Sequence, residues 1–283
     1  MDGLWDYGRP DSSEARFLKV LPLARASGDL DYQAQLLTQI ARAQGLQAKF
    51  EESHRTLDQA DSLIGPEMVK ARLRSLLERG RAFNSAARPD TAQSFFLRAW
   101  ELATRSREDF LAVDAAHMLG IVAPPEQAIE WNLRAMELAE GSADPKARSW
   151  LGSLYNNLGW TYHDRGDFRT ALEIFRKGYD WRREQDPQSA ETRIAKWTVA
   201  RALRSLGLFD DALARQTELV QEWQTAGEED GYVFEEMGEC LLALGRDEDA
   251  RPWFARAHAA LSRDPWLVEH EGARLERMAS LGG

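Results

Sequence analysis

Apolar residues recur along most of the chain at the spacing of three or four positions that is typical of amphipathic helices. The clearest stretch is residues 150–187. Its first half carries an apolar face made of Tyr155, Leu158, Gly159 and Tyr162. After a Gly166–Asp167 turn, the second half carries a face made of Phe168, Ala171, Leu172, Phe175 and Gly178. The pattern predicts two antiparallel helices, which the small residues Gly159 and Ala171 allow to pack closely.

The same arrangement of small and apolar positions recurs five more times. The predicted hairpins span residues 30–65, 68–105, 108–140, 150–187, 190–226 and 230–265. The small residue that starts the second helix recurs every 36 to 43 positions, at Ser53, Ala92, Ala128, Ala171, Ala212 and Ala250. Two hairpins are degenerate: Pro124–Pro125 occupies the turn of the third, and Gln216 stands in the fifth where an aromatic is usual.

Helices are also expected outside the repeats. Asp11, Ser12 and Ser13 form a capping signal that opens a helix through about Ala26. At the other end, Asp264–Pro265 precedes a final capping helix over residues 266–280. No Pro-, Ser- or Gly-rich linker divides the chain, so we expect a single domain over residues 1–283.

The hairpin of residues 150–187 resembles the tetratricopeptide repeat, on the evidence of Tyr155, Leu158–Gly159, Tyr162, Ala171 and Phe175. The resemblance implies an all-α, right-handed α-solenoid of about six hairpins with capping helices at both ends. The repeats are longer than the usual ~34 residues, which resembles the extended repeats of peptide-sensing regulators of bacteria. Only about thirty residues precede the first hairpin, too few for the DNA-binding domain or helical bundle of those regulators, so a direct role in transcription is not expected.

Composition agrees with a helical repeat protein. The chain has 40 Ala and 35 Leu against 8 Val and 6 Ile, which argues against a barrel, a sandwich or a parallel sheet. The net charge of −10 argues against binding to nucleic acid or to an anionic membrane. No signal peptide and no membrane span are recognisable, and the lone Cys240 forms no internal disulfide, so a cytoplasmic location is expected.

No catalytic or metal-binding pattern is found. The phosphate-loop, dinucleotide, zinc-protease and serine-hydrolase motifs are absent. The histidines are not spaced as metal ligands, and Cys240 lies beside the packing position Gly238, as a buried small residue would. We therefore predict a protein that is not an enzyme and needs no metal or cofactor.

In the repeat family, the first helices of successive hairpins line a concave groove. If Tyr155, Leu158 and Gly159 face the partner helix, then Asn156 and Trp160 lie on a stripe rotated by about 100°. Carried across the repeats, this stripe also includes Arg74, Leu77, Asp114, Tyr232 and Glu235. The candidate ligand-binding residues on it are Arg42, Arg81, His117, Asn156, Asn157, Trp160, His163, Trp197, Arg201, Arg204 and Glu239.

The side chains of this stripe favour an anionic peptide. Arginine binds carboxylates through two hydrogen bonds, asparagine both donates and accepts, and tryptophan offers a stacking face. Of the ten tryptophans, Trp160 and Trp197 are the two predicted to face the groove and contact a ligand. A one-residue shift in the degenerate fifth hairpin would instead bury Trp197. The segment from Arg193 to Arg204 carries Arg193, Lys196, Arg201 and Arg204 and no acidic residue.

These features predict a non-enzymatic scaffold that holds an extended peptide or partner segment, with an acidic side chain or a free C-terminal carboxylate, in its groove. The lysines with which some family members clamp a C-terminus are not reproduced. A sensor of a small peptide or anionic small molecule, or an enzyme accessory subunit using His117, His163 and Asp164, stays open. So does self-association as a homodimer.

The segment from Glu228 to Asp249 is strongly acidic and is opposed only by Arg246. Its spacing does not fit a calcium loop. Two interpretations remain, a solvated acidic face or an electrostatic patch for a basic partner.

Overall fold

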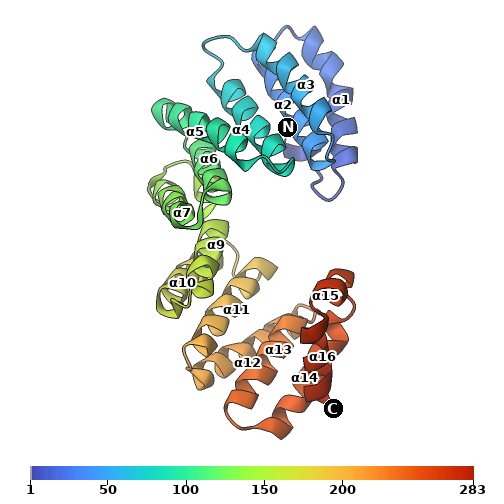
Figure 1. The fold of residues 1–283 in the computed structure, drawn as a ribbon, viewed down its shortest axis with the longest axis vertical. Coiled ribbons are helices and arrows are strands. Elements are labelled where there is room, and N and C mark those ends of the chain that lie inside the picture. The colour runs from blue at the N-terminus through green and yellow to red at the C-terminus, as the bar shows by residue number, and fades with distance from the viewer. Residues whose placement is uncertain (1) are drawn as a thin grey trace. The chain divides into compact units, whose positions relative to one another are not determined.

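The computed structural model describes residues 2–283, with every side chain among them except those of Asp2 and Pro125. Each regular element in this part of the chain is a helix, and the predicted all-α fold of helical hairpins is confirmed (Figure 1). None of these helices is long and apolar enough to cross a membrane. The chain forms two compact units, which divide after Leu154. The single solenoid domain predicted over residues 1–283 stays a prediction, because each unit is described by itself.

Unit 1 begins with a short 3-10 helix, η1 (Asp2–Leu4), and α1 (Pro10–Ala26). Three helix pairs follow. They are α2 (Leu30–Leu46) with α3 (Phe50–Leu63), α4 (Val69–Ser85) with α5 (Pro89–Ser106), and α6 (Asp109–Val122) with α7 (Pro125–Gly141). The short α8 (Pro145–Arg148) packs against α6 and α7. The first helices of successive pairs are neighbours, since α4 packs on both α2 and α6 (Figure 1).

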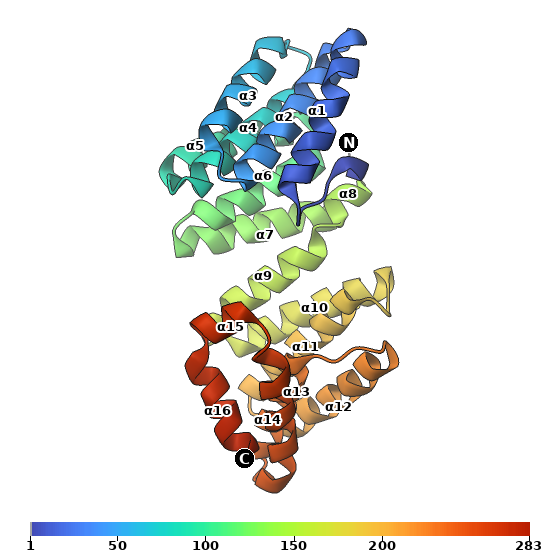
Figure 2. The same ribbon diagram turned by 90° about the vertical axis from the view of Figure 1, so that its right-hand side faces the viewer.

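Unit 2 takes up the chain within α9 (Leu151–Asp164), which pairs with α10 (Phe168–Gln185). The next pairs are α11 (Ala190–Ser205) with α12 (Phe209–Thr225), and α13 (Gly231–Ala243) with α14 (Asp247–Leu261). Two terminal helices, α15 (Pro265–His270) and α16 (Gly272–Gly282), close the unit, with α16 packed along α14 (Figure 2).

A glycine under an aromatic ring holds three of the hairpins together. A Cβ added at Gly80 would lie 2.5 Å from the ring of Phe96, and one at Gly238 would lie 2.9 Å from the ring of Phe254. The ring of Phe175 covers Gly159 in the same way, and all three phenylalanines are buried. Because each glycine precedes its phenylalanine by sixteen positions, the sequence pattern and the packing report the same contact.

The degenerate hairpins replace this contact. Gly120 of α6 packs against the amide of Asn132, which donates to the carbonyl of Ala128. In the α11–α12 hairpin the aromatic position is Gln216, which is fully buried, and neither its amide nitrogen nor its amide oxygen has a hydrogen-bond partner. An unpaired buried amide is unfavourable, so this position costs stability in the α11–α12 hairpin.

The turns inside the hairpins share one geometry but differ in residue type. Each of five first helices ends in a residue of left-handed conformation, followed by an amide that bonds back to the helix, as Lys49 does to Gln44. In unit 1 the left-handed residues are Ala48 (φ 58°) and Ala87 (φ 57°). In unit 2 they are Gly166, Gly207 and Gly245, which adopt this conformation without strain.

Candidate functional site

The predicted ligand-binding residues fall in both units. Arg42, Arg81 and His117 lie in unit 1, on α2, α4 and α6. The others lie in unit 2: Asn156, Asn157, Trp160, His163, Trp197, Arg201, Arg204 and Glu239. Within each unit the structure brings the arginines among them into contact with carboxylates of the neighbouring first helix.

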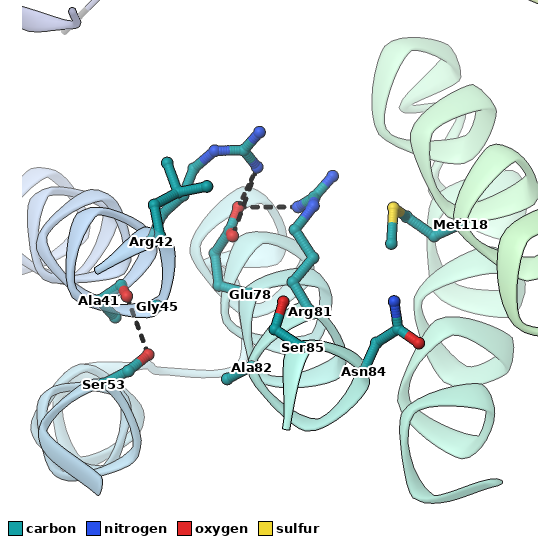
Figure 3. Close-up of a pocket in the computed structure, with 11 residues that line it drawn as sticks. Ala41, Arg42, Gly45, Ser53, Glu78, Arg81, Ala82, Asn84, Ser85 and Met118 are labelled. Carbon is teal, nitrogen blue, oxygen red and sulfur yellow. Dashed lines mark hydrogen bonds and ion pairs between the residues drawn. The ribbon is translucent and has the colours of Figure 1, made fainter. Parts of the chain in front are cut away.

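In unit 1 four side chains form a continuous chain of ion pairs, which we call the α2–α6 charge chain: Arg42, Glu78, Arg81 and Asp114. Glu78 accepts from Arg42 at 3.0 Å and from Arg81 at 2.8 Å, and Arg81 also pairs with Asp114. Figure 3 shows both arginines turned toward Glu78 from two neighbouring helices. Burial alone lowers the pKa of Arg81, but the charges of Asp114 and Glu78 outweigh it and raise that pKa above its ordinary value. The α2–α6 charge chain thus contains two arginines and two carboxylates, and its charges balance.

A groove of about 470 Å³ opens beside this charge chain, and we call it the unit 1 groove. Its volume lies in the range of ligand pockets. All four members of the charge chain line it, and so do two further cations, Arg74 and Lys146. A smaller cavity of about 180 Å³, drawn in Figure 3, shares Arg42, Glu78 and Arg81 with the groove and continues toward Asn84 and Met118.

One wall of the groove comes from the N-terminal segment. The rings of Trp5 and Tyr7 stack at 4.8 Å and 2°, and the Trp5 indole donates to Gln39 of α2 at 2.9 Å. The guanidinium of Arg42 lies 5.9 Å from the Trp5 ring and 5.8 Å from the Tyr7 ring. Tyr7 is 63% exposed, so this wall offers an uncovered aromatic face.

Phe110 of α6 and Trp150, which lies between α8 and α9, supply further aromatic lining, with ring centroids 6.3 Å apart. His117 packs against Trp150 at 5.2 Å. Burial lowers the pKa of His117, with the charge of Arg81 adding to the effect and that of Asp114 opposing it. The imidazole is therefore a neutral packing partner of a groove residue at neutral pH.

Arg74 differs from every other arginine of the groove. It lies on α4, one helical turn before Glu78, and lines the groove with it. No hydrogen bond or ion pair joins it to any residue whose side chain the structure describes, and its Nε is buried without a partner. The groove thus contains a cation that the α2–α6 charge chain does not neutralise.

The aromatic candidates of unit 2 pack on one another. Trp160 and Trp197 are both half-buried, with ring centroids 6.0 Å apart. Trp160 also meets Phe175 edge to face, and the Trp197 indole donates to the carbonyl of Tyr232 at 3.2 Å. Trp197 is thus neither fully buried nor free. Asn156 and Asn157 are half-buried neighbours whose amides lie 3.4 Å apart.

The arginines of unit 2 are paired. Arg204 donates twice to Glu236, at 2.7 and 2.8 Å, and Arg201 lies 3.2 Å from the same carboxylate. Burial lowers the pKa of Arg201, against the opposing charge of Glu236. Burial also lowers that of Arg204, but its hydrogen bonds to Glu236 raise the pKa overall. Glu239 pairs with Arg277 of α16.

His163 is buried in unit 2, with Nε2 2.9 Å from the hydroxyl of Ser205. Burial lowers its pKa, and the charge of Arg201 adds to this effect while that of Asp164 opposes it. Arg201 donates to the same Ser205 hydroxyl at 2.5 Å. The histidine is therefore held in a structural network with the arginines.

The basic segment from Arg193 to Arg204 and the acidic segment from Glu228 to Asp249 are both partly buried in ion pairs. Arg193 and Lys196, the start of the basic segment, are buried beside α12, where Lys196 pairs with Glu218 and Glu222. They do not join Arg201 and Arg204. In the acidic segment, Glu235 and Glu236 are buried and accept from arginines. That part of the segment is an internal counter-charge, neither a solvated face nor an open patch.

Sequence reasoning did not select the residues that complete the unit 1 groove: Trp5, Tyr7, Arg74, Phe110, Lys146 and Trp150. Arg74 was recognisable from its place on the inner stripe. Trp5 precedes the first hairpin, Trp150 is not one of the positions that define the repeat pattern, and only the fold brings both to the groove.

The groups available for chemistry are few. Among the described residues, no three His, Cys, Asp or Glu side chains are placed to hold a metal ion. The thiol of Cys240 is fully buried, and burial raises its pKa to about 12. The arrangement in unit 1 is suited to holding an anionic group against aromatic rings.

Comparison with known proteins agrees with the fold. Residues 152–185, in α9 and α10, match the tetratricopeptide repeat family model. No curated protein sequence matches the chain. Among solved structures, BtubC (BKLC) from P. vanneervenii is 14% identical, with a TM-score of 0.62 over 80% of this chain and 94% of that one. The apo form of RapI is 9% identical, with a TM-score of 0.74 over 91% and 73%.

A third similar structure is a signal-transduction ATPase with numerous domains from Pyrococcus horikoshii, which has a tetratricopeptide repeat sensor. It is 14% identical, with a TM-score of 0.72 over 95% of this chain, which spans 42% of that protein. At such identities the likeness shows the fold alone.

Proposed function

We propose that this chain, a tetratricopeptide-repeat protein, is a scaffold that binds an extended, acidic peptide segment of a partner protein on the inner faces of its first helices. In this role it acts by binding and not by catalysis. The observation that carries the proposal is the unit 1 groove, which is open, lined by four aromatic rings, and contains Arg74, a cation outside the balanced α2–α6 charge chain.

Unit 2 supports the proposal in a different way. Its half-buried rings of Trp160 and Trp197 and the exposed Tyr232 form a continuous aromatic strip. Asn156 and Asn157 are half-buried and lie on α9, less than two turns before Trp160. Their amide side chains can both donate hydrogen bonds to a peptide backbone and accept them from it. Such a strip suits apolar side chains of a bound segment more than its charges, because the arginines of this unit already have carboxylate partners.

The test is a fluorescence anisotropy titration with three fluorescein-labelled random peptide pools: one rich in Asp and Glu, one rich in Lys and Arg, and one uncharged. We expect the acidic pool to bind best, and its affinity to fall as salt is added, because the attraction is electrostatic. The Lys146→Glu variant, which reverses an exposed charge at the groove, should weaken binding of the acidic pool.

The matched control is Lys177→Glu, which makes the same charge change at an exposed position of α10 in unit 2. It should leave the affinity for the acidic pool unchanged. Equal weakening by both variants would show a diffuse charge effect and contradict a groove. If no pool binds, but citrate or inorganic phosphate raises the melting temperature, the protein is instead a sensor of small anions.

A further inference from the structure

We infer that Arg74 is the anion-binding residue of the unit 1 groove, and that it takes a side-chain carboxylate next to an aromatic or aliphatic residue of the bound segment. The inference rests on the proposed function and deepens it, since it selects one arginine and states the chemistry of its ligand. Arg42 and Arg81, which the sequence favours, have a different role.

The pairing within the groove separates the three arginines. Arg42 has Glu78 as its partner, and Arg81 has both Glu78 and Asp114. These carboxylates are almost fully buried, with side chains 6% and 9% exposed. Drawing Arg81 toward a ligand would leave the buried Asp114 without its partner, which is strongly unfavourable. Drawing Arg42 away would leave the buried Glu78 with one arginine in place of two. Arg42 and Arg81 therefore fix the shape and local charge of the groove floor.

Arg74 has no such commitment. Its Nε, like that of Arg42, is buried without a hydrogen-bond partner, but Arg74 has in addition no ion pair with any side chain that the structure describes. A buried donor of a charged group is costly to leave unpaired. A carboxylate accepts two parallel hydrogen bonds from a guanidinium. An incoming Asp or Glu would satisfy Arg74 without breaking any ion pair of the α2–α6 charge chain.

The lining beside Arg74 defines the rest of the ligand. Leu77 and Leu111 form apolar parts of the groove, and the aromatic rings of Phe110 and Trp150 stand among them. The Trp5–Tyr7 stack adds a second aromatic surface, with Tyr7 largely uncovered. An aromatic or aliphatic side chain buries apolar area against these rings while the adjacent carboxylate reaches Arg74.

The stability of a variant separates a ligand-binding role from a structural one. If Arg74 held the fold together, Arg74→Gln would lower the melting temperature. Because it has no partner to lose, we expect Arg74→Gln to melt at the same temperature as the wild type or higher. The Arg72→Gln variant is the matched control, since Arg72 lies on the same helix, is exposed, and does not line the groove.

The binding test uses two fluorescein-labelled peptide pools. The first fixes an Asp or Glu beside a Phe, Tyr or Leu, and the second has Asn or Gln in place of the acid. For the first pool, we expect Arg74→Gln to weaken binding about ten- to a hundredfold, the range for a lost charge-assisted hydrogen bond. Arg74→Lys should keep part of the affinity, and Arg72→Gln all of it. The second pool should bind weakly and be insensitive to all three variants.

The outcomes separate the two proposals. If the wild type binds the acidic pool but Arg74→Gln binds it equally well, the assignment of Arg74 is overturned and the peptide-binding function stands. An equal loss for both pools in Arg74→Gln, or a lowered melting temperature, would show a structural residue and also overturn it. If the wild type binds neither these pools nor the random ones, the proposed function itself fails.

Discussion

The inner faces of both units carry arginines paired with carboxylates, but they differ in how completely the arginines are paired. In unit 2, Arg201 and Arg204 share Glu236, while Glu235 and Glu239 pair with arginines of the terminal helix α16. In unit 1 the charges of the α2–α6 charge chain balance one another, and Arg74 has no carboxylate partner among the described residues. The two units therefore differ in whether an arginine of the inner face is left without a carboxylate partner in the described part of the chain, and the proposed role of Arg74 rests on that difference.

The aromatic residues of the inner faces also differ between the units, in how much of their surface other side chains cover. Trp160 and Trp197 of unit 2 lie against each other, so each covers part of the other. In unit 1, the Trp5–Tyr7 stack and the Phe110–Trp150 pair line a groove with space between side chains. Unit 2 therefore places its aromatic surface mainly in packing, and unit 1 leaves more of it for a ligand.

The largest effect should come from breaking the pairing of unit 2. Glu236→Ala leaves Arg201 and Arg204 without their shared carboxylate, whose side chain is 4% exposed. We expect a loss of about 3–5 kcal/mol in the free energy of unfolding, measured by urea denaturation. Glu248→Ala, at an exposed carboxylate of α14, is the control and should change little. A loss below about 1 kcal/mol for Glu236→Ala would show that the pairing is dispensable.

The inner faces of the two units differ, but both units contain hairpins held by a glycine under a phenylalanine ring. A pair of variants tests whether this contact has the same strength in both. Gly80→Ala in unit 1 and Gly159→Ala in unit 2 each push a Cβ into a phenylalanine ring. Each should lower the free energy of unfolding by about 1–3 kcal/mol. Gly141, at the end of α7, has no atom near its added Cβ, so Gly141→Ala serves as the control. Stabilisation by Gly80→Ala or Gly159→Ala would contradict the close packing.

A third variant corrects the weak hairpin of unit 2. Gln216→Met replaces a fully buried amide without partners by an unbranched apolar side chain of similar length. We expect the free energy of unfolding to rise by about 1–2 kcal/mol. The same change at Gln221, which is exposed on the same helix, should have no measurable effect. Destabilisation by Gln216→Met would indicate that the amide has a partner in solution.

The turns offer a reciprocal exchange between the units. Ala87→Gly in unit 1 relieves a left-handed alanine, and Gly207→Ala in unit 2 introduces one. We expect opposite changes of about 1 kcal/mol in thermal or urea unfolding. Changes of the same sign would mean that the two turns are not equivalent.

The smallest effect concerns pH. His117 in unit 1 and His163 in unit 2 both have a pKa lowered, mainly by burial, below the ordinary 6.5. Below that value the unfolded chain therefore binds more protons than the folded one, and stability falls as the pH decreases. His117→Gln should reduce this pH dependence of the unfolding free energy between neutral and mildly acidic solution. An unchanged slope in both His117→Gln and His163→Gln would contradict the assignment.

The fold is readable from the sequence because three hairpins repeat a contact between a glycine and a phenylalanine sixteen positions apart, such as Gly159 and Phe175. The inner stripe follows from helix geometry, and the contacts of Arg42, Arg81 and Arg204 with the next first helix agree with it. The state of each arginine does not follow, because it depends on a carboxylate some 30 to 40 positions away. Trp5 precedes the first hairpin and Trp150 is not one of the positions that define the repeat pattern, so only the folded chain reveals what they line.

The position of Glu78 has a consequence for the cooperativity of unit 1. Through its bonds to Arg42 and Arg81, and from Arg81 to Asp114, it connects α2, α4 and α6. In a repeat protein, stability is close to a sum of the energies of single repeats and of the interfaces between neighbours. Glu78 pairs with Arg42 across the α2–α4 interface, and Arg81, which contacts Glu78 within α4, pairs with Asp114 across the α4–α6 interface. Loss of α4 therefore removes both interface pairs at once. The three hairpins of unit 1 are expected to open together, with equal protection of α2, α4 and α6 against amide hydrogen exchange.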